Sequence, residues 1–197
     1  MQGENGRLQT MIIRPERNPQ GIAVLNHPNP LHGGSNINKV IQTAAKAVKN
    51  KGFICYLPNT RGTGDSDGEH DYGNGESRDL LLIIEAVRRA HPDLADNLIL
   101  GGFSFGGYIS ARVAEQAHCA KLLLIAAAVN KYQDIAPPVP DADKTLFIQG
   151  ASDDVVTLND VLRWAETQNL PITVIPGAGH FFHGKLPLLQ QTIERFL

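Results

Sequence analysis

The sequence lacks the features that mark several classes of protein. Its 197 residues include only two cysteines, Cys55 and Cys119, which is too few for a disulfide scaffold. No segment approaches the ~20 apolar residues that span a bilayer. The N-terminus has no charged region followed by an apolar stretch of signal-peptide length. We therefore expect no membrane span, and the sequence predicts a cytoplasmic protein.

A strong excess of charge of either sign is also missing. The chain has 18 Lys and Arg residues against 20 Asp and Glu residues, a formal net charge of -2. A nucleic-acid-binding surface needs clustered positive charge to neutralise phosphates, so nucleic acid is not an expected partner. The length suits one domain with a sizeable core, and no internal repeat or linker divides it. We predict a single domain over residues 1–197.

Short apolar segments alternate along the chain with longer segments of helical periodicity. The predicted strands are 7–13, 21–26, 52–57, 97–102, 121–126, 145–150 and 171–176. The predicted helices are 35–51, 75–90, 104–117, 158–168 and 185–196. Several strands are apolar at nearly every residue, as is typical of strands covered on both faces. The pattern predicts an α/β fold: a mostly parallel central sheet of about seven strands with helices on both faces.

A serine between glycines follows the strand 97–102. Residues 102–106 read GFSFG and fit G-x-S-x-G, the turn that presents a nucleophilic serine between a strand and a helix. The motif is short, and an idle serine in a glycine-rich turn is the alternative. Phosphate-binding motifs do not fit, because no P-loop pattern occurs and the glycine pairs beginning at Gly62 and Gly73 lack the third glycine of a dinucleotide fingerprint. We predict that Ser104 is a nucleophile.

Candidate partners for this serine occur downstream in a suitable order. A serine nucleophile needs a base and a carboxylate that orients the base, and in this type of fold the acid precedes the histidine. Asp153 lies just after the strand 145–150 and is the predicted acid, with Asp154 as the alternative; either could instead cap the next helix. His180 follows the last strand and is the predicted base. His183 could be a second metal ligand beside it, but no carboxylate or cysteine stands at ligand spacing, so no metal is predicted.

Two backbone N–H groups must also face the oxyanion that forms during acyl transfer. Phe105, the residue after the predicted nucleophile, supplies one. The loop after the strand 21–26 contains Pro28 and Pro30, which have no N–H, so Asn29 between them is the predicted second donor. We expect the neighbouring His27 to be structural.

In this order and spacing, the motifs resemble the α/β-hydrolase superfamily, in particular its small lidless bacterial members. The matching segments read HPNPLHGG, PNTRGTGDSDG, GGFSFGG, IQGASDDVV and GAGHFFHGKL. The resemblance implies that Ser104, Asp153 and His180 form a catalytic triad, that Asn29 and Phe105 supply the oxyanion donors, and that no cofactor is needed.

The sequence departs from the family pattern at a few places. Ala151 stands where Asp is frequent, and Thr157 stands where proline is frequent, but neither change removes a catalytic group. The N-terminus is short for a full eight-stranded sheet, so the first strand is expected to be missing. Arg61 belongs to a matching loop whose role we expect to be structural.

The expected activity is hydrolysis of a carboxylic ester or thioester through an acyl-enzyme. The proline-rich segment 126–144 has room for a loop or a short helix but not for a lid, so no cap domain is predicted. An open site favours small or protruding acyl groups, and a second copy of the chain could cover it as a homodimer. A peptidase or amidase with the same triad and a non-catalytic binding protein of this fold are the alternatives.

Overall fold

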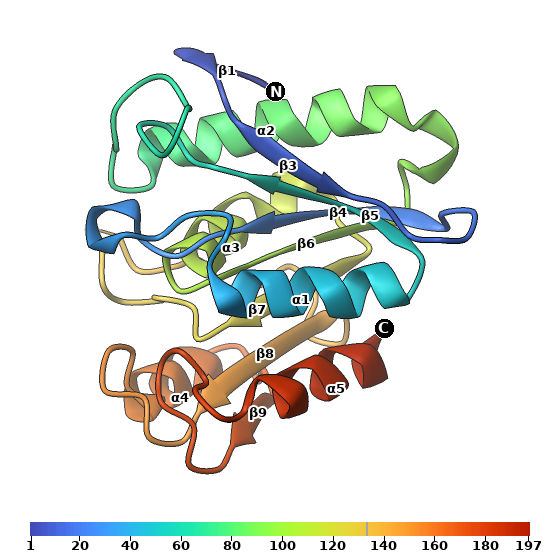
Figure 1. Cartoon of the computed structure of the whole chain (residues 1–197). Coiled ribbons are helices and arrows are strands. Elements are labelled where there is room, and N and C mark those ends of the chain that lie inside the picture. Colours follow the sequence, from blue (N-terminus) through green and yellow to red (C-terminus); the bar gives the residue numbers. More distant parts are fainter. Residues whose placement is uncertain (133) are drawn as a thin grey trace.

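The centre of the protein is a seven-stranded sheet, described here from a computed structural model that covers residues 1–132 and 134–197 (Figure 1). Its strand order is β3–β5–β4–β6–β7–β8–β9. The strands are β3 (Thr10–Ile13), β4 (Gly21–Asn26), β5 (Phe53–Pro58), β6 (Leu98–Phe103), β7 (Lys121–Ile125), β8 (Thr145–Gly150) and β9 (Ile172–Ile175). All neighbouring pairs are parallel except β3 and β5. The predicted sheet is confirmed.

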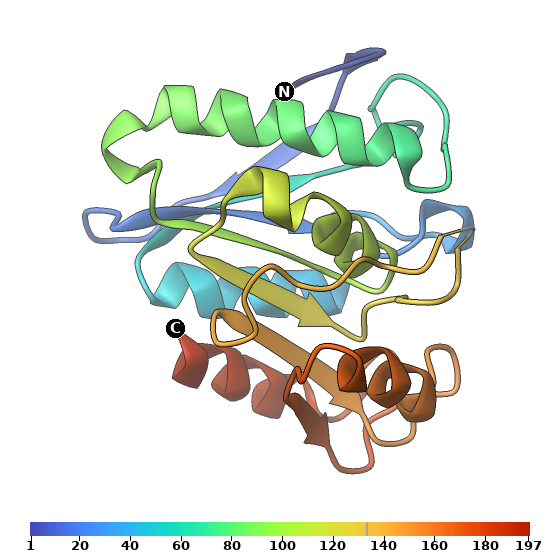
Figure 2. The same ribbon diagram turned by 180° about the vertical axis from the view of Figure 1, so that it is seen from behind.

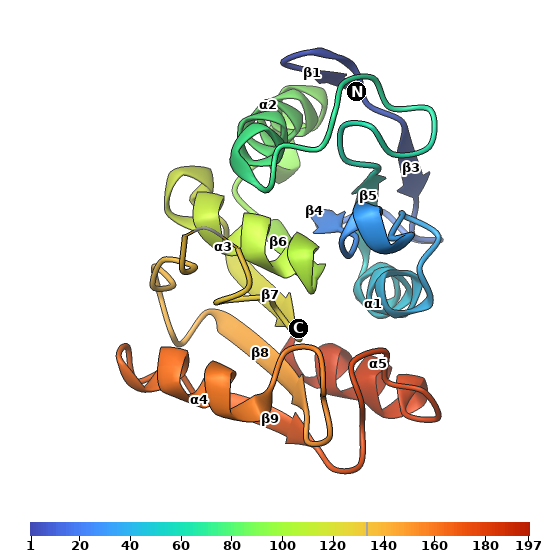
Figure 3. The same ribbon diagram turned by 90° about the vertical axis from the view of Figure 1, so that its left-hand side faces the viewer.

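Helices cover both faces of this sheet. Figure 3 shows α1 (Lys39–Asn50) and α5 (Leu186–Phe196) on one face. The other face is covered by α2 (Asn74–Ala90), α3 (Phe105–Ala117) and α4 (Leu158–Glu166), which lie in front of the sheet in Figure 2. This three-layer arrangement confirms the predicted α/β architecture.

The two helical layers explain why the strands are apolar at successive positions. In β4, Ile22 and Val24 belong to the buried cluster that includes α2 and α3. Ala23 and Leu25 between them belong to the cluster on the α1 and α5 face. Successive side chains of a strand point to opposite faces, so both sets must be apolar when both faces are covered.

The N-terminal elements differ from the sequence prediction. The predicted strand 7–13 is divided: β2 (Gly6–Arg7) pairs with β1 (Gln2–Gly3) in a separate two-stranded sheet, and β3 of the main sheet begins only at Thr10. The first long helix begins at Lys39 rather than at residue 35. The Asn38 side chain accepts a hydrogen bond from the Val40 N–H, which caps the helix at that point.

The order of the strands creates a position for a ligand. From β4 the chain passes first to β5 on one side and then, after α2, to β6 on the other side of β4. The chain therefore leaves β4 towards one face of the sheet and leaves β6 towards the other face. Open α/β sheets bind ligands in the crevice between two such loops. Between β7 and β8, the described residues 126–132 and 134–144 contain turns and bends but no helix, consistent with the absence of a cap. In the described ranges, we find no helix that has both the length and the apolar character for a membrane span.

The turn after β6 depends on close contact between backbones. A Cβ atom on Gly102 would overlap the Gly106 carbonyl carbon, and one on Gly106 would overlap the Asn26 carbonyl group. These glycines let the start of α3 approach both its own strand and the end of β4.

We expect Gly106→Ala to lower the free energy of unfolding by about 1–3 kcal/mol or more, because the new methyl group meets backbone that cannot turn away. Urea unfolding measures this loss. Gly179→Ala is the matched control, since the nearest atom to its added Cβ is the Ser152 carbonyl oxygen at an ordinary 3.8 Å. Equal stability of the two variants would contradict the argument.

Candidate active site

Ser104 occupies a sharp turn between β6 and α3. Its backbone has φ 54° and ψ -113°, a conformation that L residues rarely adopt. Neighbouring backbone holds the turn in place: the Ser104 N–H donates to the Ile125 carbonyl at 2.9 Å, and its own carbonyl accepts from the Ala128 N–H at 3.1 Å. The side chain is thereby fixed at the carboxyl end of the sheet.

His180 lies between Ser104 and Asp153. Its Nε2 is 3.0 Å from the Ser104 Oγ, and its Nδ1 is 2.8 Å from the Asp153 Oδ2. The ring is held from its sides by Phe103 and Phe181, whose ring centroids are 4.8 and 5.2 Å away. The structure thus brings the three predicted residues into one hydrogen-bonded row, in the arrangement that lets a histidine take a proton from a serine.

Asp153 is fixed by more than its contact with His180. Its Oδ1 accepts the Val155 and Val156 N–H groups at 2.9 and 2.8 Å, and its Oδ2 also accepts the Gln149 Nε2 at 3.0 Å. These donors balance the charge of a carboxylate whose side chain is fully buried. Asp154, the alternative acid, is exposed to solvent.

Gln149 is a residue of this site that the sequence analysis did not single out. Its side chain is fully buried, and its amide also donates to the Val156 carbonyl at 2.8 Å. A signal was available, because Gln149 is a polar residue near the end of the mostly apolar strand β8. A buried amide in such a place needs hydrogen-bond partners, and one of them is Asp153.

The two predicted oxyanion donors lie on segments that meet beside Ser104. Phe105 is the first residue of α3, where backbone N–H groups have no partner within the helix. Asn29 caps a short 3₁₀ helix (Pro30–His32), and its carbonyl accepts from the Gly34 N–H at 3.0 Å. Because Gly106 packs against the Asn26 and His27 backbone, the start of α3 lies against the base of the Asn29 loop.

Comparisons with known proteins agree with this arrangement. A sequence profile described as serine aminopeptidase, S33, matches residues 29–148, more than half of the chain; this range includes Ser104 and ends before Asp153 and His180. A solved structure of an alpha-beta serine hydrolase homologue from Coxiella burnetii is 37% identical, covering 100% of this chain and 95% of that one, with a TM-score of 0.89. The chain belongs to the α/β-hydrolase superfamily.

Two further solved structures resemble this α/β-hydrolase. A protein of Xanthomonas campestris, described as a serine hydrolase without a lid, is 35% identical over 98% of this chain and 89% of its own, with a TM-score of 0.88. A putative α/β-hydrolase of Agrobacterium tumefaciens is 29% identical over 100% of this chain and 92% of its own, with a TM-score of 0.89. Both relatives support the hydrolase fold, and the Xanthomonas campestris protein supports its lack of a cap.

His27 holds the Asn29 loop of this α/β-hydrolase to the loop after β5. The ring is fully buried, its Nδ1 donates to the Pro28 carbonyl at 2.7 Å, and its Nε2 accepts the Thr60 N–H at 3.0 Å. Burial is the main cause that lowers the pKa of His27 to about 4. These contacts agree with the structural role expected for His27.

We expect the stability of this α/β-hydrolase to fall as the pH drops from about 6.5 towards 4. Unfolded His27 takes up a proton near its ordinary value of 6.5, whereas folded His27 resists protonation until about pH 4. The unfolded state therefore binds more protons in this interval, and the loss between pH 7 and pH 5 is about 2 kcal/mol. Urea unfolding at the two pH values measures it. His27→Gln should show a smaller loss, and an unchanged loss in this variant would remove His27 as the cause.

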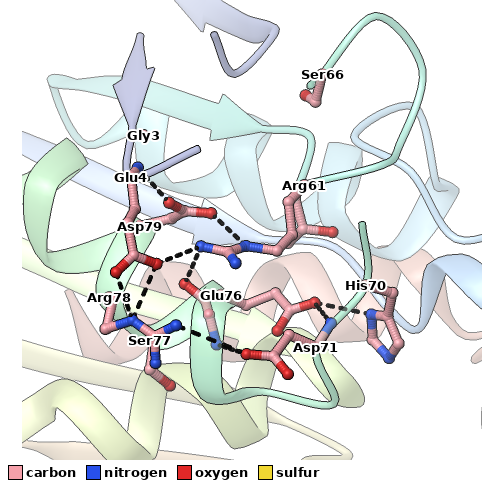
Figure 4. A network of polar contacts seen from close by, with 12 residues as sticks. Gly3, Glu4, Arg61, Ser66, His70, Asp71, Glu76, Ser77, Arg78 and Asp79 are labelled. Atoms are coloured by element: carbon pink, nitrogen blue, oxygen red, sulfur yellow. Dashed lines mark hydrogen bonds and ion pairs between the residues drawn. The ribbon is translucent and has the colours of Figure 1, made fainter. Parts of the chain in front are cut away.

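A buried charged network joins α2 to the N-terminal hairpin (Figure 4). The Arg61 side chain is 3% exposed, and its Nε donates to Asp79 at 2.8 Å. Its Nη2 donates to the Gly75 carbonyl at 2.9 Å and pairs with Glu4 at 3.1 Å. Arg61 thus ties its loop to α2 and to the N-terminal hairpin, contacts that are structural in kind.

The part of the chain that the structure describes contains no metal-binding cluster, and the groove along α4 lies away from Ser104, Asp153 and His180. Within residues 1–132 and 134–197, no group of three or more His, Cys, Asp or Glu side chains is arranged to hold a metal ion. A groove of about 540 Å³ runs along α4 and is lined in part by Leu162, Arg163 and Leu170, but it includes none of the residues in the hydrogen-bonded row.

Proposed function

We propose that this α/β-hydrolase cleaves a carboxylic ester or thioester with Ser104 as its nucleophile. The observation that carries the proposal is the continuous row of contacts from Asp153 through His180 to Ser104, at 2.8 and 3.0 Å. These distances need no rearrangement before proton transfer to the imidazole.

The reaction follows from this geometry in two halves. As Ser104 Oγ attacks the carbonyl carbon, its proton passes to His180 Nε2, and Asp153 stabilises the imidazolium that results. The Asn29 and Phe105 N–H groups bind the oxyanion of the tetrahedral intermediate. His180 then returns the proton to the leaving alcohol or thiol, which departs and leaves an acyl-enzyme. Water, deprotonated by the same histidine, attacks the acyl carbon; His180 then passes this proton to Ser104 Oγ as the acyl bond breaks, which releases the acid and restores the free serine.

The loops at the carboxyl end of the sheet, the end that carries Ser104, support a small or protruding acyl group. Four large apolar side chains on loops after four different strands are between 45% and 70% exposed: Leu31, Tyr72, Ile135 and Phe181. Since no helix lies over these loops in the described part of the β7–β8 connection, substrate reaches the serine from an open, apolar rim.

A peptidase is the second candidate, because the matching family is described as a serine aminopeptidase. An aminopeptidase needs an anion that receives the free ammonium group of its substrate. Asp153 is occupied by four hydrogen-bond donors, and fully buried Glu76 by the Asp71 and Gly73 N–H groups and His70. Neither carboxylate is free to receive that ammonium group, which favours the ester or thioester.

A panel of activated substrates tests the proposal. The purified protein is incubated with a fluorophosphonate probe and then assayed with nitrophenyl acetate, butyrate and octanoate, with acyl thioesters, and with aminoacyl nitroanilides. We expect labelling, and turnover that is fastest for short acyl esters or thioesters. Preference for the nitroanilides would favour the peptidase, and absence of both labelling and turnover would favour a non-catalytic protein.

A further inference from the structure

A second histidine lies on the Phe105 side of the predicted nucleophile. His70 is on the loop between β5 and α2, and its side chain is only 8% exposed. Its ring centroid is 5.0 Å from that of Phe105 and 5.0 Å from that of Tyr72. The hydrolytic steps proposed above do not use this imidazole.

Glu76 fixes the protonation pattern of this ring. The Glu76 carboxylate is fully buried and is held by the Asp71 and Gly73 N–H groups, both at 2.9 Å. One of its oxygens lies 2.8 Å from His70 Nδ1, an ion-pair distance without the angular geometry of a hydrogen bond. A carboxylate at this distance repels a nitrogen lone pair and attracts an N–H, so Nδ1 carries the proton. In the neutral ring, Nε2 is then an acceptor.

His70 Nε2 has no partner in the part of the chain that the structure describes. The nitrogen is buried, and Figure 4 shows it on the side of the ring away from Glu76 and the rest of the network. Buried polar atoms are nearly always hydrogen-bonded, so this nitrogen calls for a donor from outside the described residues.

The position of His70 relates it to both oxyanion segments. Phe105, against which its ring packs, directly follows Ser104. The next residue of α3, Gly106, packs against the Asn26 and His27 backbone at the base of the Asn29 loop. His70 therefore lies beside the start of α3, which in turn packs against the base of the Asn29 loop.

We propose that His70 is a specificity-determining residue whose Nε2 accepts a hydrogen bond from a hydroxyl group of the substrate. This inference rests on the proposed ester or thioester hydrolysis and narrows its substrates to hydroxylated ones. Tyr72 borders the site: its ring centroid lies 5.0 Å from that of His70, and the residue is 60% exposed. A substrate hydroxyl reaches Nε2 when this ring moves aside.

Matched pairs of esters test the inference. Ethyl 3-hydroxybutyrate against ethyl butyrate places the hydroxyl in the acyl part, and glyceryl monobutyrate against propyl butyrate places it in the alcohol part. In at least one pair, we expect the wild type to prefer the hydroxylated ester by about 3- to 10-fold in kcat/KM, the effect of one hydrogen bond. His70→Phe keeps an aromatic ring against Phe105 and removes the acceptor, so it should abolish this preference. His118→Phe, the same change at an exposed residue after α3, should retain it.

The readout separates this inference from the proposed function. The preference is a ratio measured on one sample, so a smaller folded fraction of His70→Phe does not alter it. Glu76→Gln provides a second variant and should weaken the preference, because the proton on Nδ1 is no longer fixed by a carboxylate. Equal ratios in wild type and His70→Phe would overturn the inference and assign Nε2 to a buried water. Failure of every ester, together with no fluorophosphonate labelling, would instead overturn the proposed hydrolase activity.

Discussion

Ser104→Ala is expected to lose ester turnover by about 10⁶-fold in kcat and to lose all labelling by the fluorophosphonate probe. The alanine keeps the turn, but the atom 3.0 Å from His180 Nε2 is gone, so no acyl-enzyme forms. What remains is the modest acceleration that the oxyanion donors give to attack by water. Stopped assays at high enzyme concentration measure this residual rate.

A similar loss of kcat is expected for His180→Ala and for the double variant of Ser104 and His180. His180→Ala should be about as slow as Ser104→Ala, and the double variant should be no slower than either, because the two residues act as one unit. Circular dichroism and urea unfolding check that the variants remain folded. If Ser104→Ala retained wild-type activity, the nucleophile would lie elsewhere in the molecule.

Asp153→Asn is expected to lower kcat by about 10⁴-fold while the fold is preserved. The amide oxygen can still accept the Val155 and Val156 N–H groups. The amide nitrogen then occupies the Oδ2 position, where it donates to His180 Nδ1 and favours the tautomer with its proton on Nε2. That tautomer cannot take the proton of Ser104.

Asp154→Asn is the matched control for this substitution. Asp154 is the next residue along the chain and is exposed to solvent. Asp154→Asn makes the same chemical change away from His180, so the kcat of this variant should stay within about twofold of the wild type. Steady-state kinetics on one nitrophenyl ester suffices for both variants. A large loss in Asp154→Asn with normal activity in Asp153→Asn would exchange the two roles.

Most of the sheet could be predicted from the sequence because its strands are covered on both faces. Segments such as 145–150 are apolar almost throughout and are separated by helices of regular periodicity. The hairpin of β1 and β2 could not be predicted in this way, since two-residue strands are too short to show a pattern. The start of α1 depends on one side chain: Asn38 caps the helix, so the helix begins at Lys39 although the helical periodicity of the sequence extends further back.

The candidate site was predictable where a motif carries the geometry and not where tertiary contacts do. A serine between glycines, an aspartate after a strand and a histidine after the last strand each have a local signature. Glu76 has no such signature, and Gln149 has only its polarity within a mostly apolar strand. Gln149 supports Asp153 and Glu76 supports His70, and both pairs are formed only by the fold. Exposure also distinguished Asp153 from Asp154, which sequence spacing alone had left as alternatives.

The sequence separation of 76 positions between Ser104 and His180 also has a consequence for biosynthesis. Ribosomes deliver the chain from its N-terminus, so the serine emerges and can settle into its turn well before the histidine is made. A nascent chain that has folded through β7 and Ala128, whose backbone holds the serine turn, would hold a nucleophile without a base. Under the proposed mechanism, the growing polypeptide stays inert towards cellular esters until β9 and the loop after it are in place.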